Sequence, residues 1–72
     1  MPTSRLESEV TGTVWKIEVQ PGASVSEGDV LLILESMKME MPVEAPEDGV
    51  VEEIRVQEGQ PVKEGAVVAT LK

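Results

Sequence analysis

The sequence contains no cysteine, histidine, phenylalanine or tyrosine, and only one tryptophan. Without cysteine and histidine it cannot build the usual zinc sites, a catalytic thiol or a Ser-His-Asp triad. Its longest apolar run, residues 30–34, has strand length and is far shorter than the roughly 18 residues of a membrane span. The first residues are not followed by an apolar run of the secretory type either. We therefore expect a cytoplasmic protein with no membrane partner.

Positive charge is also scarce, with 6 lysines and arginines against 14 acids and a net charge of -8. Such a surface repels phosphate backbones, so nucleic acid is not expected as a partner. The acids either keep a monomeric protein soluble or steer it toward basic surfaces. The 72 residues are enough for one small domain, residues 1–72, with a marginal core.

Valine is the commonest apolar residue, and glycine and proline recur at short intervals. This composition is typical of an all-β protein with many short strands. Turn formers such as Pro21-Gly22 and Glu27-Gly28 separate the apolar segments. The predicted strands are 4–9, 12–20, a short strand near 25, 30–36, 39–45, 49–57, a short strand near 62, and 66–72.

The sequence repeats itself at a distance of 37 residues, with 11 identities over the 23 positions 12–34. The half-repeats are about 4–34 and 41–71. Two copies are too few for a solenoid, so we expect two halves packed about a pseudo-twofold axis as a flattened barrel or sandwich, each half giving one sheet face. Apolar positions 14, 17 and 19 change spacing from odd to even, which predicts a β-bulge. The repeated glycines are interpreted as turn residues with positive φ.

The two halves meet between Met37 and Lys38, which predicts a hairpin with these two residues as its turn. Tight turns of this kind favour Asn-Gly, so bulky residues here would store strain, which tends to gather at functional sites. The alternative is an amphipathic helix over residues 31–41, because leucine, methionine, glutamate and lysine are good helix formers. The cross-strand pairs that the hairpin implies are Ser36 with Met39, Leu34 with Met41 and Leu32 with Val43.

Lys38 is the only lysine in the segment between the two repeats. An exposed lysine is usually no more than a solvated side chain. Here Met37 and Met39 flank it, and long apolar side chains at a hairpin tip bury little unless another protein docks there. Trp15, whose repeat partner is Glu52, is either a half-buried side chain on the sheet or part of a contact patch.

The run Glu35-Ser36-Met37-Lys38-Met39-Glu40 resembles the attachment motif of the biotinyl/lipoyl attachment domain family, most often Ala-Met-Lys-Met. The resemblance extends over nearly the whole chain, through Gly12-Thr13-Val14, Pro21-Gly22, residues 27–30 and residues 45–50. The chain is most similar to short, free-standing biotin carboxyl carrier proteins, also called biotin/lipoyl attachment proteins. The resemblance implies two four-stranded antiparallel sheets in a flattened barrel, with the lysine on an exposed hairpin turn.

The resemblance also implies a function, in which Lys38 is the covalent attachment site for biotin. A biotin protein ligase would load it, and a biotin carboxylase and a carboxyltransferase would then use it. Met37 and Met39 would be the residues that the ligase and the carboxylases inspect, and Glu35 would match an acid implicated in ligase recognition. The carrier itself would perform no catalysis and would serve a carboxylase system such as the acetyl-CoA carboxylase of fatty acid metabolism.

Two departures from the family pattern bear on this interpretation. Ser36 replaces the usual alanine, and the short connection over residues 19–23 leaves no room for the protruding thumb of some acetyl-CoA carboxylase carriers. One alternative keeps the fold and attaches lipoate for a 2-oxo acid dehydrogenase complex, although lipoyl domains typically have Asp-Lys-Ala at the turn. Another is an unmodified interaction module, as in membrane-fusion adaptors.

Overall fold

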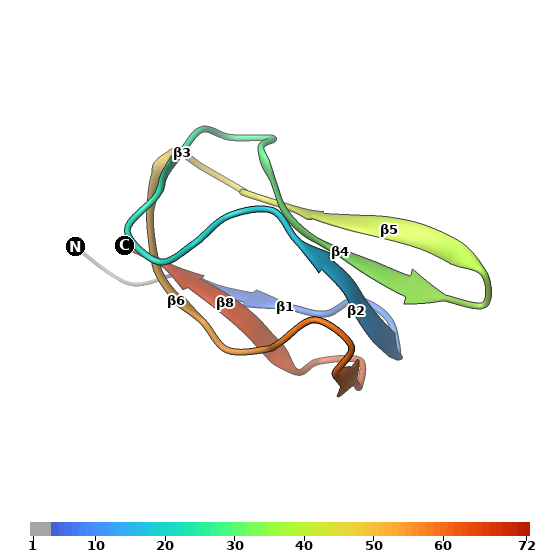
Figure 1. Cartoon of the computed structure of the whole chain (residues 1–72). Helices are drawn as coiled ribbons and strands as arrows, with labels where there is room; N and C mark the ends of the chain where they lie inside the picture. The colour runs from blue at the N-terminus through green and yellow to red at the C-terminus, as the bar shows by residue number, and fades with distance from the viewer. Residues whose placement is uncertain (1–3) are drawn as a thin grey trace.

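The computed structural model describes residues 4–72, and these form eight β-strands and no helix (Figure 1). The helix considered over residues 31–41 is therefore wrong. Apolar side chains alternate there with a period of two, and Pro42 suits an edge strand and not a helix interior. None of the described residues forms a helix that could cross a membrane. The strands are β1 (Ser4–Glu7), β2 (Gly12–Ile17), β3 (Ser24–Val25), β4 (Val30–Ser36), β5 (Met39–Glu44), β6 (Gly49–Ile54), β7 (Pro61–Val62) and β8 (Val67–Leu71).

The strands form two antiparallel four-stranded sheets with the orders β1-β8-β6-β3 and β5-β4-β2-β7. Replacing each strand by its repeat partner, 37 residues away in the sequence, converts one strand order into the other. This confirms the pseudo-twofold repeat. The expectation that each half supplies one sheet is wrong, because each sheet takes two strands from each half. The reason lies in the links, such as residues 8–11, which cross from one sheet to the other. Ser8 in this link exchanges backbone hydrogen bonds with Gly65 and Ala66, each 2.8 Å long.

A β-bulge interrupts β2 and another interrupts β6 at the equivalent position. Val14 pairs with Leu34 and Lys16 pairs with Ile33, which leaves Trp15 as the extra residue. The predicted bulge is confirmed. A second pair of bulges lies in β4 and β8. The bulge in β4 lets two consecutive residues, Leu31 and Leu32, both face the core.

The core lies between the two sheets, and its apolar side chains are all aliphatic. Strands β2 and β6 end at Ile17 and Ile54, three residues earlier than predicted, because the chain leaves the ladder ahead of the turns at Gly22 and Gly59. Val19, just beyond β2, still packs against the core. The buried apolar residues are Leu6, Val14, Val25, Leu31, Leu32, Leu34, Ala45, Val51, Val56, Val62, Val68, Ala69 and Leu71.

The repeated glycines divide into two groups. Those at the turns have positive φ, as predicted. Gly12 and its repeat partner Gly49 do not, so for this pair the interpretation as turn residues is wrong. They begin strands β2 and β6, where a neighbouring backbone passes close by. A Cβ atom on Gly12 would collide with the backbone oxygen of Glu35. This close approach is the reason that a glycine is needed there.

The molecule is elongated, with extents of 35 × 17 × 17 Å. The hairpin between β4 and β5 forms one end of the long axis, and β8 runs to the opposite end (Figure 1). There Leu71 pairs with Ser4 of β1. The fold therefore separates the hairpin tip from the ends of the described chain.

Candidate functional site

The hairpin turn is the one predicted from the repeat. Ser36 pairs with Met39, Leu34 with Met41 and Leu32 with Val43. Met37 has φ 52° and Lys38 has φ 66°, the left-handed conformation that a two-residue hairpin turn demands of both central residues. These are the only non-glycine residues with positive φ among the described residues. The sheet therefore holds two bulky side chains in a conformation that usually belongs to glycine and asparagine.

The side chains at this tip extend into solvent. Met37 is 92% exposed and Met39 is 60% exposed, and Lys38 is exposed between them. Within residues 4–72 the ion pairs join Lys16 to Glu18 and Arg55 to Glu53, so none involves Lys38. The Lys38 amine is therefore open to a reagent that approaches from outside.

The base of the hairpin is fastened to the link between β1 and β2. The Ser36 hydroxyl donates a hydrogen bond to the backbone oxygen of Thr11, 2.9 Å away. Beside it, Gly12 lies against the backbone of Glu35 with no space for a side chain. The serine that departs from the family pattern thus holds the hairpin to the barrel, an observation that the sequence pattern did not provide.

Glu35 lies on the outer face of β4, directly opposite Glu40 of β5. Both carboxylates are exposed. The four candidate residues, Glu35, Met37, Lys38 and Met39, therefore share one end of the molecule, with Glu35 in the second pair below the turn. Glu40 was quoted as part of the motif but was not given as a candidate site residue, although its pair with Glu35 lies between two predicted pairs of the hairpin.

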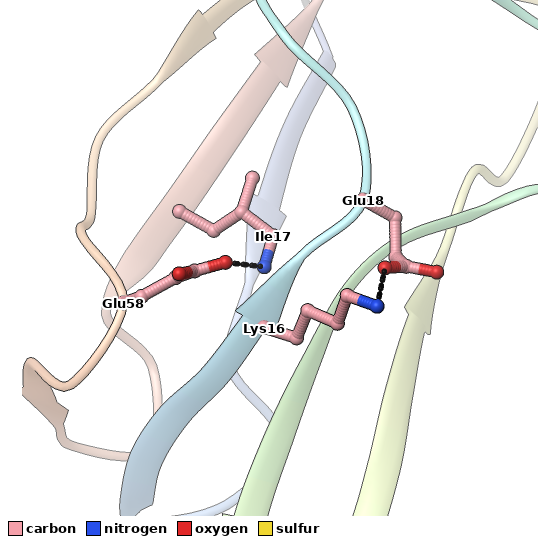
Figure 2. A network of polar contacts seen from close by, with 4 residues as sticks. All are labelled: Lys16, Ile17, Glu18 and Glu58. Carbon is pink, nitrogen blue, oxygen red and sulfur yellow. Dashed lines mark hydrogen bonds and ion pairs between the residues drawn. The ribbon is translucent and has the colours of Figure 1, made fainter.

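Strand β2 supports the hairpin from the side, and polar contacts hold it in place (Figure 2). A Glu58 carboxylate oxygen accepts a hydrogen bond of 3.0 Å from the backbone nitrogen of Ile17, and the Lys16 amine lies 3.4 Å from a Glu18 oxygen. Trp15, in the bulge of the same strand, is 49% exposed on the outer face. It is one of the exposed large apolar side chains, so both alternatives, a half-buried side chain on the sheet and a contact patch, stay predictions.

An open groove of about 590 Å³ runs between the edge strands β1 and β5. Its lining includes four glutamates but not Lys38. Among the described residues no three acids are grouped closely enough to hold a metal ion. The groove therefore lies apart from the hairpin tip, and the chemistry of the exposed amine belongs to the tip alone.

The fold and the exposed lysine define a class, that of domains which carry a cofactor on a hairpin. The family model described as "Biotin-requiring enzyme" matches residues 3–71. The chain therefore belongs to the biotin/lipoyl attachment family, and the predicted resemblance is confirmed.

Two curated relatives and one solved structure illustrate the relationship. The biotin/lipoyl attachment protein of Bacillus subtilis is 41% identical over 44 residues, which is 61% of this chain and 60% of that protein. The biotinylated protein TB7.3 homolog of Mycobacterium leprae is 44% identical over 46 residues, covering 64% and 65%. The urea carboxylase of Kluyveromyces lactis superposes on 100% of this chain and 6% of its own, with a TM-score of 0.94 and 38% identity.

In each case the match spans less than two thirds of the relative's length. The comparisons agree on biotin as the cofactor and on a carrier domain that is itself not catalytic, and they do not favour the lipoyl alternative. The two four-stranded antiparallel sheets implied by the resemblance are also confirmed.

Proposed function

We propose that this chain is a biotin carboxyl carrier in which biotin is attached to the side-chain amine of Lys38. A biotin protein ligase would attach it. A biotin carboxylase and a carboxyltransferase would then use it in turn. The single observation that supports this most is the position of Lys38, exposed and without an ion pair at the tip of a turn that the whole sheet constrains.

The attachment chemistry uses an acyl-adenylate that the ligase would hold. The Nζ atom of Lys38 attacks the acyl carbon of biotinyl-adenylate, the amide bond forms, and the bond between that carbon and the phosphate oxygen breaks with release of AMP. The amine must give up protons, and neither ion pair among residues 4–72 engages it. We expect the docked ligase to provide the base. The chain's own part is to present the amine beyond the barrel, where it can enter another protein's active site.

Once attached, biotin would carry a carboxyl group between two active sites. The carrier contributes by keeping the cofactor tethered, which raises its effective concentration at both sites. The similarity to a urea carboxylase over the whole chain supports a place in a biotin-dependent carboxylase. Three finer points stay predictions: that the chain is a separate monomeric subunit, that it serves acetyl-CoA carboxylase, and that it resides in the cytoplasm. A domain inside a longer protein would show the same similarity to the urea carboxylase over its whole length.

The test is the intact mass of the protein after incubation with biotin, ATP and a biotin protein ligase. We expect the mass to increase by one biotin less one water. Lys38→Arg should abolish the increase, because it keeps the charge but removes the nucleophile. Lys63→Arg is the matched control, since Lys63 is also exposed but lies in the other half of the chain.

Two results would overturn the proposal. One is an unchanged mass for the wild-type chain, and the other is full modification of Lys38→Arg. A parallel reaction with lipoate and a lipoate ligase separates the two cofactors, and we expect no increase there. An unmodified interaction module would give no increase with either ligase.

A further inference from the structure

The pseudo-twofold repeat gives this molecule two equivalent outer sheet faces, and they differ in chemistry. On the sheet that carries the hairpin, the outer row consists of Trp15, Ile33 and Pro42. Ile33 pairs with Pro42 on one side and with Lys16 on the other, and Trp15 is the bulge residue next to Lys16. Trp15 is 49% exposed, Pro42 is exposed and Ile33 is partly so. We call these three residues the apolar row.

The other sheet has a polar or charged residue at each equivalent position. Glu52 replaces Trp15 and Arg5 replaces Pro42, and both are exposed, while Thr70 replaces Ile33 and is buried, at 4% exposure. The pairing there is the same, with Arg5 opposite Thr70 and Thr70 opposite Glu53. The fold therefore does not need an apolar side chain at the two exposed positions, those of Trp15 and Pro42. Exposing one only beside the hairpin is unfavourable in water unless another surface covers it.

A pair of acids separates the apolar row from the turn. Glu35 and Glu40 face each other across the hairpin, an arrangement of like charges that destabilises a sheet unless a cation lies nearby. Lys16, which pairs with Ile33 on this face, forms an ion pair with Glu18 (Figure 2). The face below Lys38 thus presents two carboxylates and then an apolar row. It is complementary to a partner surface with basic groups beside a nonpolar patch.

We propose that the apolar row is the docking surface for the enzyme that acylates Lys38, and that Trp15 is its anchor. This rests on the function proposed above. The ligase is the favoured occupant because it must bring its active site within bonding distance of the Lys38 amine, and so must lie against the hairpin. The enzymes that later act on the attached biotin reach it at the far end of its arm, farther from the hairpin than the reaction at the Lys38 amine.

Charge supports the same occupant. An enzyme that holds an anionic acyl-adenylate surrounds it with basic groups, and these can meet Glu35 and Glu40 as the enzyme closes on the hairpin. The groove between β1 and β5 is also acidic, with four glutamates in its lining, so charge alone does not select one of the two approaches. The outer face of β4 and β2 is favoured because it combines the acid pair next to Lys38 with exposed apolar surface that a partner would cover.

The test compares variants that the repeat itself shows to be compatible with the fold. Trp15→Glu installs the residue that the other copy has at this bulge, and Trp15→Gln removes the ring without adding charge. Glu52→Gln is the control on the opposite face. The measurement is kcat/KM for ligase-catalysed biotinylation at limiting carrier, together with thermal unfolding to verify the fold. Loss of an anchoring tryptophan should lower kcat/KM about 10-fold, and mainly through KM, while Glu52→Gln should match the wild type.

A second measurement detects docking directly. Trp15 is the only tryptophan, so biosynthetic labelling with 5-fluorotryptophan gives a single ¹⁹F resonance. In the Lys38→Arg background no product forms, and adding unlabelled ligase should shift or broaden this resonance. A carrier that self-associates through the same face would show concentration-dependent broadening without ligase, and that result would contradict the proposal.

The outcomes distinguish this inference from the proposed function. If the wild-type chain gains no biotin, the proposed function fails. If the wild type is biotinylated and folded Trp15→Gln and Trp15→Glu react equally fast, the docking surface is wrong while the function stands. An unperturbed ¹⁹F resonance at saturating ligase would also overturn it.

Discussion

Adding one methyl group at Gly12 should loosen the hairpin from the barrel, whereas adding it at the symmetry-related Gly49 should not. A Cβ atom on Gly12 would fall well inside the 3.0 Å limit that real Cβ contacts respect, against the backbone oxygen of Glu35. The corresponding atom on Gly49 would lie 3.1 Å from the backbone oxygen of Lys72, which a small shift relieves. The two substitutions are chemically identical and differ in how tightly the neighbouring atoms surround the added methyl group.

The expected loss of stability depends on how easily the backbone oxygen of Glu35 can move. The Glu35 oxygen belongs to the ladder between β2 and β4 and cannot rotate away, so Gly12→Ala should cost about 1–3 kcal/mol of overpacking. Alanine is better than glycine in a strand by about 0.5–1 kcal/mol, which offsets part of this loss and leaves Gly49→Ala near zero. We expect the free energies of unfolding of the two variants to differ by about 2 kcal/mol. This is a large share of the total free energy of unfolding, which is about 4–11 kcal/mol for a domain of 72 residues.

Urea unfolding provides the assay, followed by the fluorescence of Trp15 and by far-ultraviolet circular dichroism. For a slope of about 1 kcal/mol per molar urea, the midpoint of Gly12→Ala should lie about 2 M below that of Gly49→Ala. Biotinylation of the folded Gly12→Ala protein should also slow, because the displaced β4 carries Lys38 with it. Equal midpoints for the two variants would refute the reasoning.

Three further substitutions test individual contacts, each by urea unfolding. Met37→Gly should raise the free energy of unfolding by roughly 1 kcal/mol, because glycine tolerates the left-handed turn; a decrease would contradict the assignment of strain. Thr70→Val should stabilise by about 1 kcal/mol, since the Thr70 hydroxyl is buried without a hydrogen-bond partner; a loss of stability would mean that this hydroxyl is satisfied. Ser36→Ala should cost about 0.5–1 kcal/mol through the bond to Thr11 yet leave biotinylation at Lys38 intact, and unchanged stability would show that the bond contributes nothing.

The sequence predicted the turn, its register and the bulge because all three are local consequences of the repeat. Once Leu34 and Leu71 are aligned, the midpoint at Met37-Lys38 and the pair Ser36–Met39 follow by counting. The bulge could be found because an extra residue is the simplest way for one strand to change its apolar spacing from odd to even.

Other features could not be found in this way because they depend on tertiary neighbours. The exchange of strands between the halves depends on where the links cross, and an unexchanged pairing would have the same apolar pattern. Gly12 resembles a turn residue in the sequence because nothing there shows that another backbone passes beside it. The bond from Ser36 to Thr11 likewise joins residues that are distant in the chain.

The placement of the hairpin has a mechanical consequence. Lys38 lies at one end of a 35 Å body, and Leu71 and Ser4 pair at the other end. When that far end is held by a neighbouring segment, a modest rotation of the rigid barrel about it sweeps the tip through a wide arc. The barrel then acts as a lever, and the travel of the cofactor between active sites is set by the pivot and by the length of the body as well as by the flexible side chain.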